Sequence, residues 1–178
     1  MVRIFITGVS DVGKSTIGRI VAERLGVMFF DLDNEIEAFF GMTIERLQSK
    51  YLTMYSYREE AAKALTHLLK RPESKDCVIA LPPSGLMGGF LRIVKKSSGT
   101  IIALIDKPEN LLKRITFYDI DSNLIEKNLT SDEKKWYRSE IKKDITYFGK
   151  TYDRAHLKID ISGLTIEQSV GKVLETIK

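Results

Sequence analysis

The sequence predicts a three-layer α/β fold, in which helices cover both faces of a parallel β-sheet. Short apolar runs alternate with segments of helical periodicity along the 178 residues. A glycine-rich loop joins the first apolar run to the first helical segment. The composition, 43% hydrophobic and 29% charged, excludes a disordered chain or a coiled coil. We therefore expect a single domain over residues 1–178.

The first elements are a strand, a helix and a second strand. Residues 3–7 form an apolar run typical of a buried strand, and Gly8 ends it. Residues 15–25 have apolar side chains at helical spacing, and Gly26 is placed to end that helix. Residues 27–30 are apolar again and predict the second strand.

Helices follow the second strand. Asn34 and Glu37 have the spacing of a capping box, which predicts a short helix ending at Gly41. Residues 43–48 add another turn or two, and residues 57–69 form a longer amphipathic helix.

The second half continues the alternation. The predicted strands are residues 77–81, 100–105 and 157–161. Helices are predicted to begin near Asp106, at Thr130 and at Thr165, and Gly149 is expected to end the second of these. Residues 116–130 are polar and poorly periodic. No second domain or repeat is evident in this pattern.

Several classes of protein are excluded by what the sequence lacks. No apolar run reaches the roughly eighteen residues of a membrane-spanning helix, and the N-terminus lacks a signal-peptide cleavage site. Cys77 is the only cysteine, so an internal disulfide is impossible. The two histidines, His67 and His156, do not suffice for a Cys/His metal site. We expect a cytoplasmic protein with no membrane partner.

The charge balance favours small anionic ligands. Twenty-eight basic and 24 acidic residues give a net charge of +4. Dense Lys/Arg runs with interleaved aromatic residues are missing, so nucleic acid is not expected as a partner.

The loop after the first strand has the pattern of a phosphate-binding P-loop. Residues 8–15 read G-V-S-D-V-G-K-S and match G-x-x-x-x-G-K-[ST] between a strand and a helix. Main-chain amides and the helix N-terminus would bind the phosphates of a nucleotide, Lys14 can reach the β- and γ-phosphates, and the Ser15 hydroxyl can ligate Mg²⁺. The expected nucleotide-binding residues in this loop are Gly8, Asp11, Val12, Gly13, Lys14, Ser15 and Thr16. The acid Asp11 suits such a loop only if it points away from the phosphates.

Two aspartates follow the second strand, at the sheet edge that carries the loop. Asp31 can hold a water on Mg²⁺, and Asp33 can accept the hydrogen bond or the proton of a hydroxyl to be phosphorylated. The alternative is that one of them caps the next helix, a role that Asn34 already fills. Arg58 either clamps a carboxylate or phosphate or forms a surface ion pair. Asp106 resembles a Walker B acid, but a helix cap explains it better.

These residues together resemble shikimate kinase. The resemblance covers the P-loop with Ile17-Gly18-Arg19, residues 22–37 (A-E-R-L-G-V-M-F-F-D-L-D-N-E-I-E) and Gly41-Met42-Thr43-Ile44, and it resumes loosely at residues 78–80 and at Tyr152-Asp-Arg-Ala. It implies a P-loop kinase with a five-stranded parallel sheet in the order 2-3-1-4-5. It also implies an acceptor-binding region near residues 31–60, a lid near residues 116–132, and a place in aromatic amino acid biosynthesis.

The resemblance implies transfer of the γ-phosphate of MgATP to the 3-hydroxyl of shikimate. Lys14, Ser15 and Asp31 would then serve MgATP, and Arg114 would stack on adenine. In the acceptor site Asp33 would bind the hydroxyls, Arg58 the carboxylate, and Gly85 would complete the contacts. We expect Lys14 and Asp33 to be the catalytic residues and the protein to act as a monomer.

The sequence departs from the family pattern in the acceptor and lid regions. Asp11 replaces the middle glycine of the family's phosphate loop, and Leu81-Pro82-Pro83-Ser84 replaces a glycine triplet. Prolines supply no N–H groups, so they do not copy that triplet. The R-P-L-L motif of the lid is missing, and Phe148 stands where a second carboxylate-binding arginine is expected.

Candidate replacements for these cations are all basic residues of the second half. They are Arg138 and Lys127 for the lid, and Lys142, Lys143 or Lys150 for the acceptor site. Two alternative functions remain open. One is a kinase for another small hydroxylated acid or phosphorylated metabolite, and the other is a nucleotide-binding protein without transfer activity. A third hypothesis is a polynucleotide kinase. It depends on Asp11 alone, because some RNA 5′-hydroxyl kinases carry a similar D-V-G-K-S-T run.

Overall fold

The core of the protein is a five-stranded parallel sheet with the order β2-β3-β1-β4-β7. The computed structural model describes residues 2–177. The strands are β1 (Arg3–Thr7), β2 (Met28–Asp31), β3 (Cys77–Ala80), β4 (Thr100–Ile105) and β7 (Leu157–Asp160). Because β7 is the fifth strand of this sheet along the chain, the predicted order 2-3-1-4-5 is confirmed.

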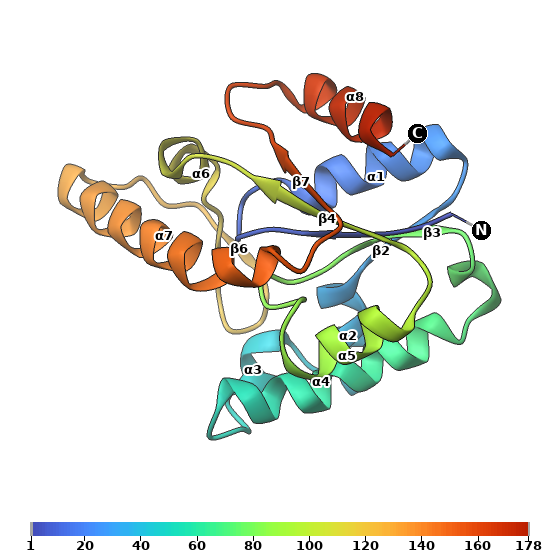
Figure 1. The fold of residues 1–178 in the computed structure, drawn as a ribbon. Helices are drawn as coiled ribbons and strands as arrows, with labels where there is room; N and C mark the ends of the chain where they lie inside the picture. Colours follow the sequence, from blue (N-terminus) through green and yellow to red (C-terminus); the bar gives the residue numbers. More distant parts are fainter. Residues whose placement is uncertain (1, 178) are drawn as a thin grey trace.

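Helices cover both faces of the sheet (Figure 1). The helices are α1 (Lys14–Leu25), α2 (Leu32–Phe40), α3 (Ile44–Gln48), α4 (Met54–Leu69), α5 (Gly88–Lys96), α6 (Pro108–Arg114), α7 (Ser131–Tyr152) and α8 (Ile166–Thr176), with a 3-10 turn η1 (Pro72–Ser74). One face carries α1 and α8, and the opposite face carries α2, α4 and α5. The pair α6 and α7 stands on the side where the strands end (Figure 1).

The middle strand β1 is buried on both sides. Phe5 and Ile6 have no exposed surface, which explains the nearly continuous apolar run of this strand. Helix α1 lies close to the sheet at Gly18, where an added Cβ would come within 2.9 Å of the Phe29 ring. A larger residue at this position would require either α1 or the Phe29 ring to shift.

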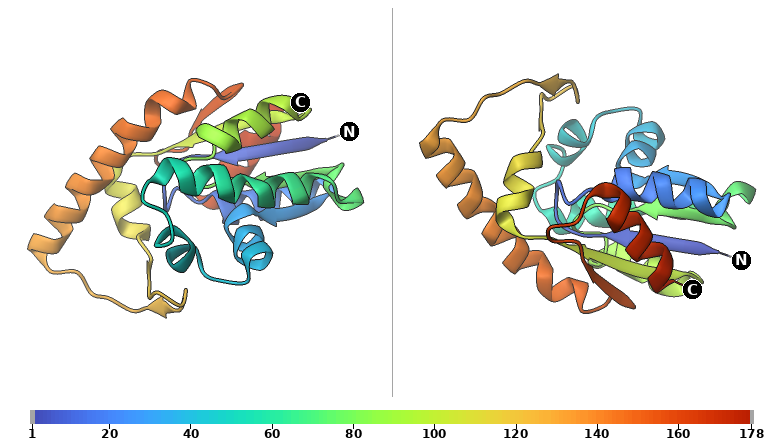
Figure 2. Two further views of the ribbon diagram at one scale, coloured as in Figure 1. Left: turned by 90° about the horizontal axis from the view of Figure 1, so that it is seen from below. Right: turned by 90° about the horizontal axis from the view of Figure 1, so that it is seen from above.

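A small antiparallel hairpin stands apart from the main sheet. It consists of β5 (Phe117–Tyr118) and β6 (Leu124–Ile125) and lies within the predicted lid, residues 116–132. In both views of Figure 2 the hairpin lies beside α3, and an extended segment connects it to α7. The hairpin therefore spans the space between the nucleotide-loop side and the α2–α3 side of the molecule.

Two helix predictions are corrected. Gly149 does not end α7, which runs to Tyr152, because Thr151 and Tyr152 are buried and the Tyr152 hydroxyl donates a hydrogen bond to the Pro83 carbonyl. Helix α5 was not expected from the sequence. Its first turn contains two glycines, and an added Cβ at Gly89 would lie 2.8 Å from the Ala62 side chain of α4. These glycines permit close helix packing, although in the sequence they resemble a loop.

Within residues 2–177, no helix combines the length and the apolar character needed to cross a membrane.

Candidate active site

The ends of β1, β2 and β3 open into a cavity of about 500 Å³, which we call the phosphate-loop cavity. Its lining comes from the loop after β1, the start of α1, the β2–α2 junction, the loop after β3, the end of α6 and the hairpin. The lining residues are Ser10, Asp11, Gly13, Lys14, Ser15, Thr16, Asp31, Asp33, Ala80, Leu81, Pro83, Arg114, Thr116 and Tyr118. Parallel α/β sheets bind ligands at this edge.

The loop backbone takes a conformation that needs its glycines. Gly13 has φ 98°, in the left-handed region, and an added Cβ at Gly8 would lie 2.7 Å from the Leu104 carbonyl oxygen. Helix α1 begins at Lys14 without a side-chain cap, so its first amides are available to a ligand. A cluster of N–H groups at a helix N-terminus binds phosphate.

Lys14 folds back over this loop. Its ammonium group donates hydrogen bonds to the carbonyls of Gly8 (3.0 Å) and Val9 (2.8 Å). Burial lowers the pKa of Lys14, and the carboxylates of Asp33 and Asp31 oppose that shift. The carboxylates therefore favour the charged ammonium form that a phosphate ligand requires.

The predicted nucleotide-binding residues divide into two groups. Asp11, Gly13, Lys14, Ser15, Thr16 and Arg114 line the cavity. Gly8 and Val12 do not: the Val12 side chain is buried in the core, and Gly8 provides the carbonyl that holds Lys14. Gly8 and Val12 therefore support the conformation of the loop without lining the cavity.

Asp11 faces the hairpin. It is one of the few non-glycine residues with a left-handed backbone, at φ 60°, and its carboxylate accepts a 3.0 Å hydrogen bond from the Thr116 hydroxyl. Burial raises the pKa of Asp11, although the hydrogen bond from Thr116 and the charges of Lys14 and Arg114 oppose that shift. The acid thus binds the base of the hairpin while it lines the phosphate-loop cavity.

Asp31 joins the phosphate loop to α2. One of its oxygens accepts a hydrogen bond from the Ser15 hydroxyl, and the other accepts the main-chain N–H of Asp33 at 3.1 Å. Asp31 is therefore the N-cap of α2, and the prediction of an Asn34 cap is wrong. The predicted partner Glu37 instead accepts hydrogen bonds from the Ile44 N–H and the Ser122 hydroxyl. A hydroxyl and a carboxylate held together are ligands that suit Mg²⁺.

Asp33 follows Asp31 by two residues, in the first turn of α2, and lines the same cavity. Burial, together with the negative charge of Asp31, raises the pKa of Asp33 to about 6, and Lys14 opposes the shift. A carboxylate with this pKa is ionised at neutral pH and accepts a proton more readily than an ordinary aspartate.

A second cavity of about 430 Å³ adjoins the first and is called here the α2–α3 cavity. Its lining residues are Ser15, Asp31, Asp33, Asn34, Glu37, Ile44, Glu45, Tyr118 and Ser122. Four of these residues, Ser15, Asp31, Asp33 and Tyr118, line both cavities. The two cavities meet at the side chains that were predicted to bind Mg²⁺ and to activate a hydroxyl.

Arg58 and Gly85 line neither of these cavities. The Arg58 residue on α4 is only 8% exposed, and its Nε is buried without a hydrogen-bond partner. Gly85 is buried, and its N–H donates to the Pro82 carbonyl at 2.8 Å. An added Cβ at Gly85 would lie 2.5 Å from the Leu81 side chain, so the turn itself requires glycine.

Arg114 is held in the cavity wall by an acid. Its guanidinium donates to the Asp106 carboxylate, which also accepts from the Lys107 N–H and the Asn110 amide. Burial alone would raise the pKa of Asp106, but these hydrogen bonds outweigh it and lower the pKa. The prediction that Asp106 caps the helix is corrected, because α6 begins at Pro108 with Lys107 at the N-cap. Asp106 instead positions Arg114.

The candidate replacement cations lie elsewhere. Lys127 pairs with Glu133 at 2.9 Å and lies over the Phe117 and Tyr137 rings, and Arg138 is exposed. Neither residue lines the phosphate-loop cavity or the α2–α3 cavity.

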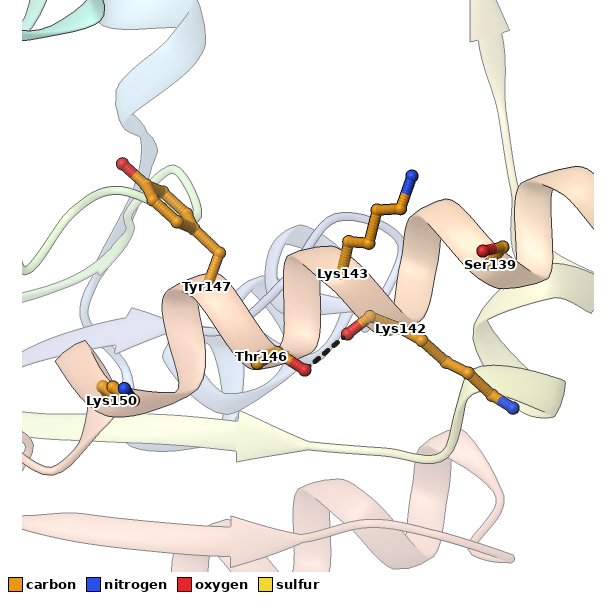
Figure 3. Close-up of a pocket in the computed structure, with 6 residues that line it drawn as sticks. All are labelled: Ser139, Lys142, Lys143, Thr146, Tyr147 and Lys150. Carbon is orange, nitrogen blue, oxygen red and sulfur yellow. Dashed lines mark hydrogen bonds between the residues drawn. The ribbon is translucent and has the colours of Figure 1, made fainter.

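A wider and shallower hollow, about 680 Å³, runs along α7. It is lined by Ser139, Lys142, Lys143, Thr146, Tyr147 and Lys150. Figure 3 shows that the three lysine side chains point in different directions, so they do not converge on one anion. The hollow contains no residue of the phosphate loop or of the β2–α2 junction.

The sequence did not identify the two hairpin residues that line the phosphate-loop cavity, Thr116 and Tyr118. Both lie in the poorly periodic stretch, which has no motif. Their proximity to the phosphate loop depends on how the hairpin folds back over it.

Comparisons with known proteins agree with this geometry. The sequence model of the family described as "Shikimate kinase" matches residues 11–178. A shikimate kinase of Chlorobaculum tepidum is 32% identical over 177 residues, covering 98% of this chain and 87% of the relative.

Solved structures show the same fold. The crystal structure of shikimate kinase from Bacteroides thetaiotaomicron superposes with a TM-score of 0.78 at 23% identity, covering 99% of this chain and 98% of that one. The shikimate kinase of Acinetobacter baumannii in complex with shikimate has a TM-score of 0.73 at 22% identity, covering 99% and 93%. With a family match over nearly the whole sequence and a fold shared from end to end, this chain belongs to the shikimate kinase family.

Proposed function

We propose that this protein transfers the γ-phosphoryl group of ATP to a hydroxyl of shikimate or of a closely related small hydroxy acid. The observation that carries the proposal is the meeting of the two cavities at Ser15, Asp31 and Asp33. ATP would occupy the phosphate-loop cavity, and the acceptor would reach Asp33 from the side of the α2–α3 cavity. Membership of the shikimate kinase family supports the choice of acceptor.

The residues present fit MgATP. Ser15 and Asp31 would hold the Mg²⁺ ion, which when bound would neutralise negative charge on the phosphates. The loop amides and Lys14 would hold the phosphates, and Arg114, fixed by Asp106, would border the base.

Asp33 would orient the attacking hydroxyl. In the reaction the hydroxyl oxygen forms a bond to the γ-phosphorus, the bond between that phosphorus and the β–γ bridging oxygen breaks, and ADP leaves. The hydroxyl proton passes to Asp33 and then to water. Catalysis rests chiefly on positioning and on stabilising charge, and Lys14 supplies the cation nearest the phosphates.

Arg58 is the proposed partner of the acceptor's carboxylate; because Arg58 lines neither cavity, the acceptor would have to extend from the α2–α3 cavity toward α4 to reach it. Its buried Nε has no hydrogen-bond partner in the free protein, and buried guanidinium groups are normally paired. A carboxylate ligand would satisfy this group with charge-assisted hydrogen bonds.

We also propose a monomer, in the cytoplasm, that does not use nucleic acid or membrane as a partner. The chain's own hairpin borders both cavities, which supports a site formed within one copy. The α2–α3 cavity, at about 430 Å³, suits a small molecule better than a polynucleotide end.

A coupled ADP-release assay with MgATP tests the function. Shikimate should support turnover, and a panel of other hydroxy acids should support less. Lys14→Ala should lower kcat by at least about a hundredfold, since it removes a preorganised charge from the phosphates. Lys95→Ala, on the exposed side of α5, is the matched control and should retain full activity. Nucleotide binding without turnover on any acceptor would contradict the proposal and indicate an inactive nucleotide-binding protein.

A further inference from the structure

We propose that Tyr118 is a catalytic residue of this chain: it lines both cavities where they meet, and its hydroxyl donates a hydrogen bond to the phosphoryl group in transfer. The inference rests on the proposed function, because it assigns a role at the point where ATP and the acceptor would meet. It concerns a residue that no sequence motif marks.

Tyr118 has a position that the other hairpin residues do not share. Of the four residues that line both cavities, Ser15, Asp31 and Asp33 come from the phosphate loop and the β2–α2 junction. Tyr118 alone comes from the hairpin, on β5. It therefore borders the proposed transfer point from a separate part of the chain.

The hairpin is fastened at both ends, which holds this tyrosine in place. At its base the Thr116 hydroxyl donates to Asp11, at 3.0 Å. At its tip the Thr43 hydroxyl donates to the Ile120 carbonyl at 2.7 Å, and Arg46 pairs with Asp121 at 2.6 Å. Between these ends Tyr118 pairs with Leu124 of β6. These contacts together restrain the strand that carries Tyr118.

The exposure of Tyr118 is also informative. The residue is 57% exposed although its strand is pinned between two parts of the protein. A large aromatic side chain that is exposed beside a cavity, on a restrained strand, is available to a ligand.

The charges at the junction make a further acid unsuitable there, and a neutral donor is compatible with them. Asp31, Asp33, Glu37 and Glu45 line the α2–α3 cavity, and among its lining residues no lysine or arginine is present. Another acid facing a phosphoryl group would repel it, whereas a phenol donates a hydrogen bond without adding charge. Tyr118 remains chemically unchanged in the step. Its ring would also exclude water from the phosphorus, which limits wasteful hydrolysis of ATP.

The test compares Tyr118→Phe and Tyr118→Ala with the wild type. Loss of the hydroxyl should lower kcat about three- to tenfold with little change in the KM of the acceptor, since the bond strengthens during transfer. Loss of the ring should lower kcat further and should raise the ratio of acceptor-independent ATP hydrolysis to transfer. Tyr147→Phe is the matched control, because Tyr147 is 58% exposed and lines neither cavity.

A binding measurement separates this inference from the proposed function. Titration calorimetry should show that Tyr118→Phe weakens binding of a non-hydrolysable ATP analogue about three- to tenfold and leaves ADP binding unchanged. This readout holds even if the wild type turns over no acceptor. Unchanged kcat, or an unchanged ratio of the two affinities in a protein that melts like the wild type, would overturn the inference.

Discussion

The hydroxyl of Thr116 donates a 3.0 Å hydrogen bond to the carboxylate of Asp11, and this bond ties the base of the hairpin to the phosphate loop. Because Asp11 also lines the phosphate-loop cavity, one side chain touches both the space for the nucleotide and the segment that covers it. The loop therefore combines phosphate binding with control of the hairpin's position.

Asp11→Asn should increase the affinity for ATP. Asparagine tolerates the left-handed backbone at this position and still accepts the Thr116 hydroxyl, but it carries no negative charge beside the phosphates. We expect the Kd of ATP to fall about three- to tenfold at low ionic strength, and less in high salt. Calorimetry at two salt concentrations measures this. Weaker binding of ATP to the variant would contradict the argument.

Asp33→Asn should abolish transfer but stabilise the fold. Since the pKa of Asp33 is raised from 3.8 to about 6, the native state binds more protons than the unfolded state between these values. Stability therefore falls as pH rises through that window, and above it the ionised Asp33 destabilises the native state. Asparagine should raise the free energy of unfolding at pH 7 by on the order of 1–3 kcal/mol, with no gain below pH 4. Denaturant titrations at both pH values measure it.

The kcat/KM of the wild type should depend on the protonation of Asp33. As pH falls through about 6, Asp33 takes up a proton and no longer accepts one from the acceptor hydroxyl. We expect kcat/KM to decline below pH 6, and Lys95→Ala to show an identical profile. A rate that is flat down to pH 5 would show that Asp33 does not act as the base.

The ion pair at the hairpin tip should contribute modestly to closing the site. Arg46 and Asp121 are 52% and 56% exposed, and exposed pairs contribute about 0.2–1 kcal/mol. Arg46→Ala or Asp121→Ala should raise the acceptor KM about two- to fivefold, and the double variant should be no worse than either. The difference in acceptor KM between these variants and the wild type should shrink in high salt. Additive effects of the two substitutions would show that the pair does not act as a unit.

Arg58→Met should separate acceptor binding from nucleotide binding. The methionine keeps much of the buried aliphatic volume but loses the charge, so acceptor affinity should fall by about 1.5–3 kcal/mol. ADP affinity should not change, and the fold should be at least as stable, because a buried Nε without a partner is removed. Calorimetry with shikimate in the presence of ADP measures the loss. Arg24→Ala, at an exposed pair with Glu167, is the control.

Local rules allowed much of this protein to be predicted from its sequence. The phosphate loop and the capping boxes at Thr130 and Thr165 each depend on residues close together in the chain. The order of the strands was expected only from the resemblance to shikimate kinase. Apolar periodicity depends only on which side of each element is buried. The nucleotide half of the site was accessible for the same reason, since Lys14 and Ser15 lie in one continuous motif.

Tertiary structure alone decided the rest. Helix α5, with two glycines in its first turn, was not predicted from the sequence, because its close packing against α4 is a tertiary contact. Asp31 both caps α2 and accepts a hydrogen bond from Ser15, and this second contact joins residues that are 16 positions apart in the chain. The approach of Tyr118 to Asp33 depends on a hairpin pinned by side chains far away in sequence. Such contacts produce no periodic pattern in the sequence. They form, and contribute free energy, only when the folded core brings distant segments together.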